Sequence, residues 1–104
     1  MFSYFLSYSI RMFVCLFALF SFHTQALVIN QCEIQPGTEC YGLNLAFANL
    51  PYANLHGAYL FNINLSYADL SYADLSNANL KFATLNGANL SYANLSFADL
   101  THAQ

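Results

Sequence analysis

The chain has 104 residues and a formal net charge of −3; only 7% of its residues are charged, whereas 58% are hydrophobic and 17% are aromatic. A chain of this length holds one small domain, and its aromatic content excludes a disordered polymer. Its two basic residues, Arg11 and Lys81, are too few for direct binding to the phosphates of a nucleic acid.

Residues 1–26 predict a secretory signal peptide. One cation, Arg11, precedes an apolar run from Met12 to Phe20, and the segment ends with a small residue on each side of a glutamine. A retained membrane anchor is the alternative, but the apolar run is shorter than the ~20 residues needed to span a bilayer. We therefore expect cleavage after Ala26, no stable membrane span in the mature chain, and a secreted or periplasmic location.

The cysteine count agrees with export. Cleavage would remove Cys15 and leave Cys32 and Cys40 as an even pair. One disulfide between them is the natural interpretation, whereas two free thiols in a cytosolic protein is the alternative. Two cysteines without a matching histidine cluster do not make a zinc site. We expect residues 27–42 to form an N-terminal cap, closed by this disulfide, over the first rung of the domain that follows.

A five-residue repeat occupies residues 43–104. A leucine recurs at this interval, in most repeats with alanine two positions earlier and Asn or Asp between the two. Five steps turn through about 140° around an α-helix, and they reverse the face of a continuous strand, so neither element buries all the leucines. The chain must therefore bend in every repeat, at the two positions after each leucine, where Ser, Asn, Gly and Pro are frequent. The expected core leucines are Leu45, Leu50, Leu55, Leu60, Leu65, Leu70, Leu75, Leu80, Leu85, Leu90, Leu95 and Leu100.

Short extended pieces joined by bends of one hand form a β-solenoid, with rungs about 4.8 Å apart. The number of sides is open from the residues alone, because aromatic side chains recur in columns of two possible periods. These columns are Tyr52, Tyr72 and Tyr92 at one period, and Tyr52, Tyr67, Phe82 and Phe97 at the other.

The segments Ala68-Asp69-Leu70-Ser71-Tyr72 and Ala93-Asn94-Leu95-Ser96-Phe97 resemble the pentapeptide-repeat family, whose repeat is written A(N/D)LXX. The resemblance covers about 60 of the 104 residues. It implies an all-β protein that folds as a right-handed, four-sided β-helix, here of about three coils. It implies no particular activity.

On a four-sided coil, His56, Asp74 and Ser76 would be neighbours and could be drawn as a catalytic Ser/His/Asp group. Serine follows the leucine five times in this chain, so such proximity is expected by chance. Columns of exposed side chains also form no pocket that excludes water. His56 and His102 would lie on different sides and make no metal pair. We therefore expect no enzyme and no catalytic, cofactor-binding or metal-binding residue.

The function favoured by the sequence is an exported, non-catalytic scaffold that presents a flat surface to a protein or polymer partner. Some pentapeptide-repeat proteins mimic duplex DNA and inhibit topoisomerases such as gyrase, which gives one alternative. Against it, the repeats carry only Asp69, Asp74 and Asp99, whereas duplex DNA of the same height carries about eight charges. A second alternative is a binding surface for a polymer such as carbohydrate, along the column of Tyr52, Tyr72 and Tyr92.

Two further features come from the repeat itself. The final residues, Thr101 to Gln104, offer no helix, proline or charged strand to cover the last rung, so we expect a head-to-head homodimer through the Leu85–Leu100 coil. Asn-Leu-Ser triplets beginning at Asn64, Asn89 and Asn94 match a glycosylation acceptor, but the repeat generates that triplet automatically.

Overall fold

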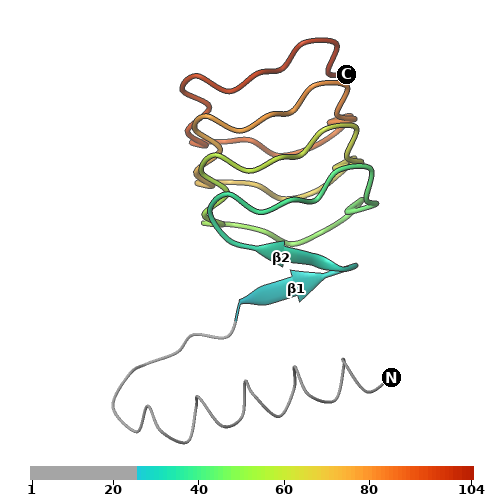
Figure 1. Ribbon diagram of the computed structural model, residues 1–104, viewed down its shortest axis with the longest axis vertical. Helices are drawn as coiled ribbons and strands as arrows, with labels where there is room; N and C mark the ends of the chain where they lie inside the picture. Colours follow the sequence, from blue (N-terminus) through green and yellow to red (C-terminus); the bar gives the residue numbers. More distant parts are fainter. Residues whose placement is uncertain (1–25) are drawn as a thin grey trace, which may run out of the picture.

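The computed structural model describes residues 26–104. The expected signal peptide, with Cys15, lies outside the described residues apart from Ala26. The described part begins with a hairpin of two strands, β1 (Leu27–Ile29) and β2 (Cys32–Ile34), which pair antiparallel. Both residues of the connecting turn, Asn30 and Gln31, have positive φ, at 46° and 71°, as a two-residue turn of type I′ requires. The hairpin lies at one end of a stack of coils, and the C-terminus lies at the other (Figure 1).

The coils repeat every twenty residues. Parallel backbone bridges join four columns: Glu39, Tyr59, Asn79 and Asp99; Asn44, Asn64 and Thr84; Asn49, Asp69 and Asn89; and Asn54, Asp74 and Asn94. Hydrogen bonds between successive rungs run in both directions; Leu75 donates its N–H to Asn94 at 2.8 Å, and Asn94 donates to Ala73 at 2.9 Å. Twenty residues at five per side give a coil of four sides, so the period of Tyr52, Tyr72 and Tyr92 is the one that the fold uses.

Each corner is a β-turn at the two positions after the leucine, where the sequence predicts the bend. In the turn from Leu70 to Ala73, the N–H of Ala73 donates to the carbonyl of Leu70 at 3.1 Å. The third residue of every such turn has φ between 56° and 70°, whether it is a glycine, an asparagine, a histidine or an aromatic residue. A positive φ at this place is the mark of a type II turn. The corners therefore hold aromatic residues in a conformation that glycine and asparagine adopt more readily.

Side chains of Asn and Asp stabilise the corners. In most repeats the Oδ1 atom of the residue before the leucine accepts the backbone N–H of the residue after it, as Asp69 does from Ser71 at 3.0 Å. Where the residue after the leucine is serine or threonine, its hydroxyl often donates to the same Oδ1 atom, as the Ser91 hydroxyl does to Asn89 at 2.6 Å. The Asn-Leu-Ser triplets are thus a structural device of the repeat, because Asn or Asp completes the turn with local hydrogen bonds.

The core is a stack of leucines and alanines. Eight leucines are at most 2% exposed: Leu45, Leu50, Leu55, Leu60, Leu65, Leu70, Leu75 and Leu80. Ala58, Ala68, Ala73, Ala78 and Ala83 are buried beside them. In the last coil Leu85, Leu90 and Leu95 are only partly buried. Leu100 is 39% exposed and is therefore not a core residue as the sequence analysis expected, because no described coil lies above it.

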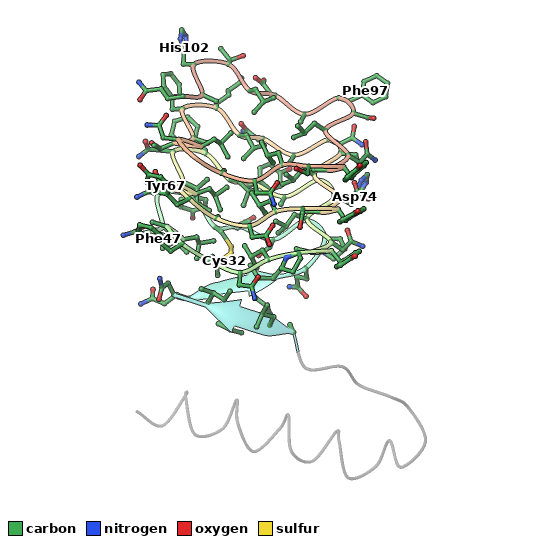
Figure 2. All side chains as sticks on the ribbon, turned by 180° about the vertical axis from the view of Figure 1, so that it is seen from behind. Cys32, Phe47, Tyr67, Asp74, Phe97 and His102 are labelled. Atoms are coloured by element: carbon green, nitrogen blue, oxygen red, sulfur yellow. A yellow bond between two sulfur atoms is a disulfide. The ribbon has the colours of Figure 1, made fainter. Side chains whose placement is uncertain are left out.

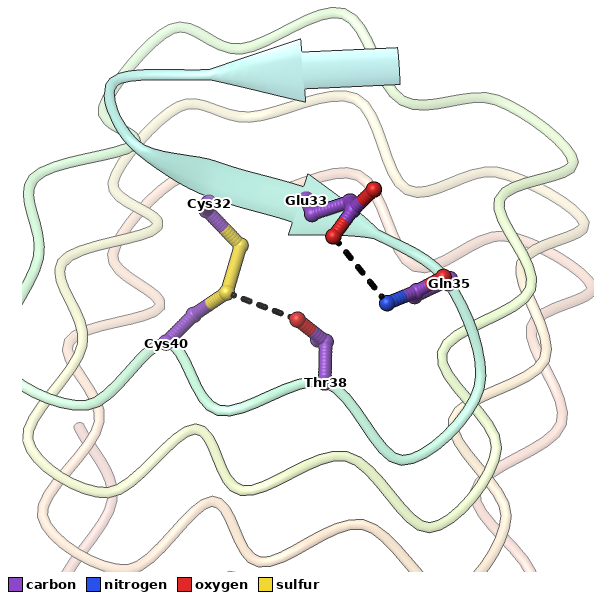
Figure 3. The surroundings of a disulfide bond; sticks show 5 residues. All are labelled: Cys32, Glu33, Gln35, Thr38 and Cys40. Carbon is purple, nitrogen blue, oxygen red and sulfur yellow. Dashed lines mark hydrogen bonds between the residues drawn. A yellow bond between two sulfur atoms is a disulfide. The ribbon is translucent and has the colours of Figure 1, made fainter. Parts of the chain in front are cut away.

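The hairpin is tied to the coils by the disulfide between Cys32 and Cys40, whose Cα atoms are 5.3 Å apart (Figure 3). Both cysteines are buried, and the Thr38 hydroxyl lies 3.3 Å from the Cys40 sulfur. No backbone hydrogen bond joins residues 27–34 to the described coils. One side-chain bond, from Asn30 to the carbonyl of Asn44 at 2.7 Å, adds to the disulfide. The hairpin therefore covers the core through side chains and a covalent link, without extending the ladder.

The first rung lies within the segment that the sequence analysis assigned to the cap. Glu39 bridges to Tyr59, and Cys40 occupies the position that leucine holds in the later repeats of the same side, below Leu60 and Leu80. Thr38 stands where those repeats have alanine, and it is buried. Thus Cys40 is both a core residue of the first coil and the anchor of the hairpin. In the part of the chain that the structure describes, no helix has the length and apolarity to cross a membrane.

Candidate functional site

The corners carry the exposed aromatic side chains. Ten aromatic residues between positions 41 and 97 are exposed, and seven of them occupy the positive-φ position of a turn: Phe47, Tyr52, Tyr67, Tyr72, Phe82, Tyr92 and Phe97. The repeat fixes their backbone, so the rings project at defined places from the edges of the stack. The columns of aromatic rings along these edges, referred to below as the corner aromatics, are the most distinctive surface of the described residues.

Tyr52, Tyr72 and Tyr92 form one continuous column. Their rings stack in parallel, with centroids 5.0 Å apart for the first pair and 4.9 Å for the second. The other candidate column, in which aromatic residues recur every fifteen residues, is not formed. Its members lie at four different corners, because positions fifteen residues apart belong to different sides of a twenty-residue coil. Stacking covers the ring faces inside the column and leaves the ring edges exposed.

Phe47 and Tyr67 form a second, shorter column, with ring centroids 5.2 Å apart (Figure 2). The next residue in this column is Gly87. A Cβ atom placed on Gly87 would lie 2.5 Å from the Cδ1 atom of Tyr67, so the Tyr67 ring occupies the space where a side chain would be. Other corners hold aromatic residues at a similar φ, so φ alone does not explain glycine here; any side chain at position 87 would require the Tyr67 ring to shift.

A third corner combines two phenylalanines and a histidine. The Phe61 and Phe82 rings meet edge to face at 5.5 Å, and the His102 ring stacks on Phe82 at 4.9 Å. His102 is thus held against an aromatic ring. It lies at a different corner from His56, as the sequence analysis expected. No group of three or more metal-ligating side chains is present within residues 26–104.

The structure brings His56, Asp74 and Ser76 together, but their hydrogen bonds do not connect them as in a catalytic triad. The Ser76 hydroxyl donates to Asp74 Oδ1 at 2.5 Å and lies 2.7 Å from His56 Nδ1. In a triad the carboxylate orients the histidine, which then takes the serine proton. Here the carboxylate contacts the serine, and Ser76 is buried. Since the serine proton is donated to Asp74, His56 Nδ1 is the donor to the Ser76 oxygen, and the three groups link two successive coils.

Three aspartates accept local hydrogen bonds that lower their pKa. The hydroxyl and then the backbone N–H of Ser76 hold the pKa of Asp74 below its ordinary value of 3.8. Thr101 acts in the same way on the pKa of Asp99, which also pairs with Lys81 at 3.2 Å. The backbone N–H of Ser71 is the largest cause of the lowered pKa of Asp69. The three carboxylates lie on three different sides, so they form no continuous acidic face.

These shifts predict that the chain loses stability in acid. Below about pH 3.8 the three aspartates are protonated in the unfolded chain while Asp69, Asp74 and Asp99 stay ionised in the folded chain. Their contribution to the free energy of unfolding is therefore fully present above that pH, and it is lost as the pH falls through the folded pKa values. Urea unfolding followed from neutral pH into this acid range should show a falling midpoint.

The repeat offers a matched control for this acid titration. Asparagine stands in the equivalent position in other repeats and accepts the same N–H, so Asp→Asn at the three sites should leave the fold intact and flatten the pH dependence. An unchanged pH dependence in the triple variant would show that other groups cause the acid unfolding.

Comparison with known proteins identifies the family of the chain. The family profile described as "pentapeptide repeats (8 copies)" matches residues 38–71 and residues 68–104. No curated protein matches the chain. The solved structures that are similar to it include three pentapeptide repeat proteins. HetL of the cyanobacterium Nostoc, involved in the regulation of heterocyst differentiation, is 36% identical, with 65% of this chain and 30% of HetL covered and a TM-score of 0.44.

The second structure is a protein of the Arabidopsis thaliana thylakoid lumen, with 29% identity, 66% of this chain and 52% of that chain covered, and a TM-score of 0.36. The third is from the cyanobacterium Cyanothece 51142, with 34% identity, 64% of this chain and 43% of that chain covered, and a TM-score of 0.33. The chain spans about half or less of the length of these proteins. Since the family profile covers well over half of the chain, this protein belongs to the pentapeptide-repeat family, and its fold is the right-handed β-helix of that family.

Proposed function

We propose that this protein is an exported, non-catalytic scaffold that binds a partner protein through its corner aromatics. The observation that carries the proposal is the exposure of rigidly placed aromatic rings; Tyr52 is 72% exposed and Tyr92 is 81% exposed although both belong to a stacked column. Exposed aromatic side chains are enriched at protein interfaces, and a ring that is already ordered loses little conformational entropy on binding.

Export is supported by two independent features. The apolar segment that follows Arg11 has the pattern of a signal peptide. The described chain also contains the Cys32–Cys40 disulfide, and such bonds persist in oxidising compartments outside the cytosol. Proteins of the pentapeptide-repeat family are generally structural and not enzymes. The hydrogen bonds at Ser76 also support a non-catalytic role. The Ser76 hydroxyl donates its proton to Asp74, whereas a catalytic serine gives its proton to the histidine.

The stacking of the tyrosine column favours a protein partner over a carbohydrate. A sugar binds an aromatic side chain by lying on the ring face, but Tyr72 is covered on both faces by Tyr52 and Tyr92. Mimicry of DNA has little support, because the carboxylates of the repeats are few and lie on separate sides. The exposed tyrosine edges and hydroxyls suit the mixed apolar and hydrogen-bonding contacts of a protein interface.

Self-association through the coil of residues 85–104 is a second part of the proposal. Its leucines are the least buried of the repeat, and the N–H groups of Leu90 and Leu95 have no partner within residues 26–104. An uncovered rung of this kind pairs readily with another chain. Sedimentation of the protein at micromolar concentration should give a dimer mass, and Leu100→Lys should restore a monomer; a monomer at every concentration would contradict a dimer.

Two measurements test the proposal. The exported chain should begin at Leu27 and carry the intact disulfide in its mass; a full-length cytosolic chain with free thiols would contradict export. A photo-reactive group at Tyr92 should then form a discrete adduct with another protein in the same compartment. The adduct should be lost when Tyr52 and Tyr72 are replaced by serine, and it should remain in the matched variant in which Ser71 and Ser91 are replaced by alanine. An adduct that survives the tyrosine replacements would contradict the corner aromatics as the binding surface.

A further inference from the structure

The corner at Asn86 and Gly87 carries the one Asn-Gly pair in the chain. An asparagine followed by glycine can react with its own backbone, because no side chain on the glycine hinders attack of the glycine nitrogen on the asparagine side-chain carbonyl. At this corner the Tyr67 ring lies over Gly87, within 2.5 Å of the place that a Cβ atom would occupy.

The two reacting groups at this corner are free of hydrogen bonds among residues 26–104. The N–H of Gly87 has no acceptor there, although the equivalent N–H of Gly42 donates to Phe61 at 2.8 Å and that of Gly57 donates to Ser76 at 2.8 Å. The side-chain amide of Asn86 also makes no hydrogen bond within the described residues, whereas that of Asn89 accepts the N–H of Ser91 at 3.1 Å. Both Asn86 and Gly87 are exposed to water.

We infer that Asn86 is a site of spontaneous deamidation in the folded monomer, in which no second copy covers the coil of residues 85–104. The Gly87 nitrogen loses its proton to water or hydroxide and attacks Cγ of Asn86. A bond forms between these two atoms, the bond from Cγ to the side-chain nitrogen breaks, and ammonia leaves with a proton from water. The product is a five-membered succinimide. One water molecule then opens the ring at either carbonyl, which gives aspartate or isoaspartate.

Both products change this corner. Each adds a negative charge to a chain in which Lys81 is the only lysine or arginine of residues 27–104. In isoaspartate the backbone runs through the former side chain and is lengthened by one carbon, so the turn that joins Ala88 N–H to Leu85 at 2.9 Å is altered. The former backbone carbonyl of Asn86, which accepts the N–H of Tyr67 at 2.9 Å, becomes part of a free carboxylate. The modification therefore alters the corner against which Tyr67 packs and to which its N–H is bonded.

The position of the corner adds to its reactivity. The rungs beside it, at Leu85 and Leu90, are only partly buried, whereas the equivalent leucines one coil earlier are fully buried. Segments with little burial and unpaired backbone open at a lower free energy than the rest of a fold. The motion that brings the Gly87 nitrogen to Cγ is thus easier here than at a corner inside the stack.

The test is peptide mapping by mass spectrometry of the folded full chain, kept dilute enough to be monomeric, during incubation at mildly alkaline pH. We expect conversion of amide to acid at Asn86, with isoaspartate among the products, faster than at any other asparagine. Asn86→Gln should abolish the conversion at this corner. A rate at Asn86 no higher than at the asparagines that precede leucine would overturn the proposal.

A matched variant tests the role of the free N–H. Tyr41→Asn creates a second Asn-Gly pair in the same kind of turn, at an exposed glycine with φ +68° whose N–H is bonded to Phe61. That pair should react about fivefold more slowly than Asn86 in the folded chain, the ratio that a net hydrogen bond of about 1 kcal/mol gives. In denaturant the two pairs should react at equal rates. Equal rates in the folded chain would overturn the role assigned to the free N–H; if Tyr41→Asn fails to fold, His56→Asn supplies the same comparison beside Gly57.

Discussion

Replacing Leu75 with alanine should destabilise the folded chain by about 2–5 kcal/mol. Leu75 is 0% exposed, and it lies between Leu55 and Leu95 in one column of the four-sided core. Its removal leaves a cavity that the coil cannot close, because the backbone ladder fixes the distance between rungs and holds the neighbouring leucines and alanines in place. The loss should appear as a lower midpoint of urea unfolding with an unchanged slope.

Two control variants separate this cavity from a general effect of substitution. Leu95→Ala removes the same atoms from the same column at a partly buried position, so it should cost clearly less than Leu75→Ala. Ser71→Ala, at a bend, should stay within about 0.5 kcal/mol. Equal losses at Leu75 and Ser71 would mean that the leucines do not form the core. Ser76 is unsuitable as a control, because it is buried and bonded to both His56 and Asp74.

Loss of the Cys32–Cys40 disulfide should cost up to about 2.5 kcal/mol, the chain-entropy value for a loop of this length. The effect should be largest at the hairpin, which has no backbone hydrogen bond to the coils. Without the disulfide, β1 and β2 are held by the Asn30 bond and by the packing of Ile29 and Ile34 on the core. Hydrogen exchange of the chain with both cysteines replaced by alanine should therefore show fast exchange at the hairpin amides and continued protection at Leu75.

The same exchange measurement under reducing conditions checks the origin of the effect. A reductant should accelerate exchange of the hairpin amides in the native sequence and should change nothing in the double alanine variant. Hairpin amides that stay fully protected after reduction would show that side-chain packing alone holds the hairpin.

Much of the fold follows from the repeat in the sequence. A five-residue period is incompatible with a straight helix or strand, so it places a bend after each leucine, and the structure has a turn there in every repeat. The number of sides could not be read from the residues, because Tyr52 belongs to columns of both periods; the family resemblance, and then the stacking of Tyr52 on Tyr72, decided it. Cys40 was missed as a core residue because neither it nor Thr38 matches the leucine and alanine of the repeat.

The surface was less predictable, since a column pattern shows which residues are neighbours but not how they bond. The proximity of His56 and Ser76 follows from the period of the coil, whereas the direction of the Ser76 hydroxyl toward Asp74 depends on the local turn. The hydrogen bonds from serine to Asn or Asp had a signal in the Asn-Leu-Ser triplets. The contact of the Tyr67 ring with Gly87 had no signal in the sequence, because a glycine in a turn is ordinarily explained by its φ alone.

The most direct test of the four-sided coil is cross-linking between successive rungs. In the structure Asn49 bridges to Asp69, twenty residues later and on the same side, whereas Asn64 belongs to the adjacent side. Paired rungs bring Cα atoms to about 4.8 Å, within the range that a disulfide requires. The double variant Asn49→Cys with Asp69→Cys should therefore oxidise completely to an intramolecular disulfide, seen by non-reducing peptide mapping, while Asn49→Cys with Asn64→Cys should keep free thiols. A disulfide in the second variant and free thiols in the first would contradict the twenty-residue coil and, with it, the arrangement of the corner aromatics.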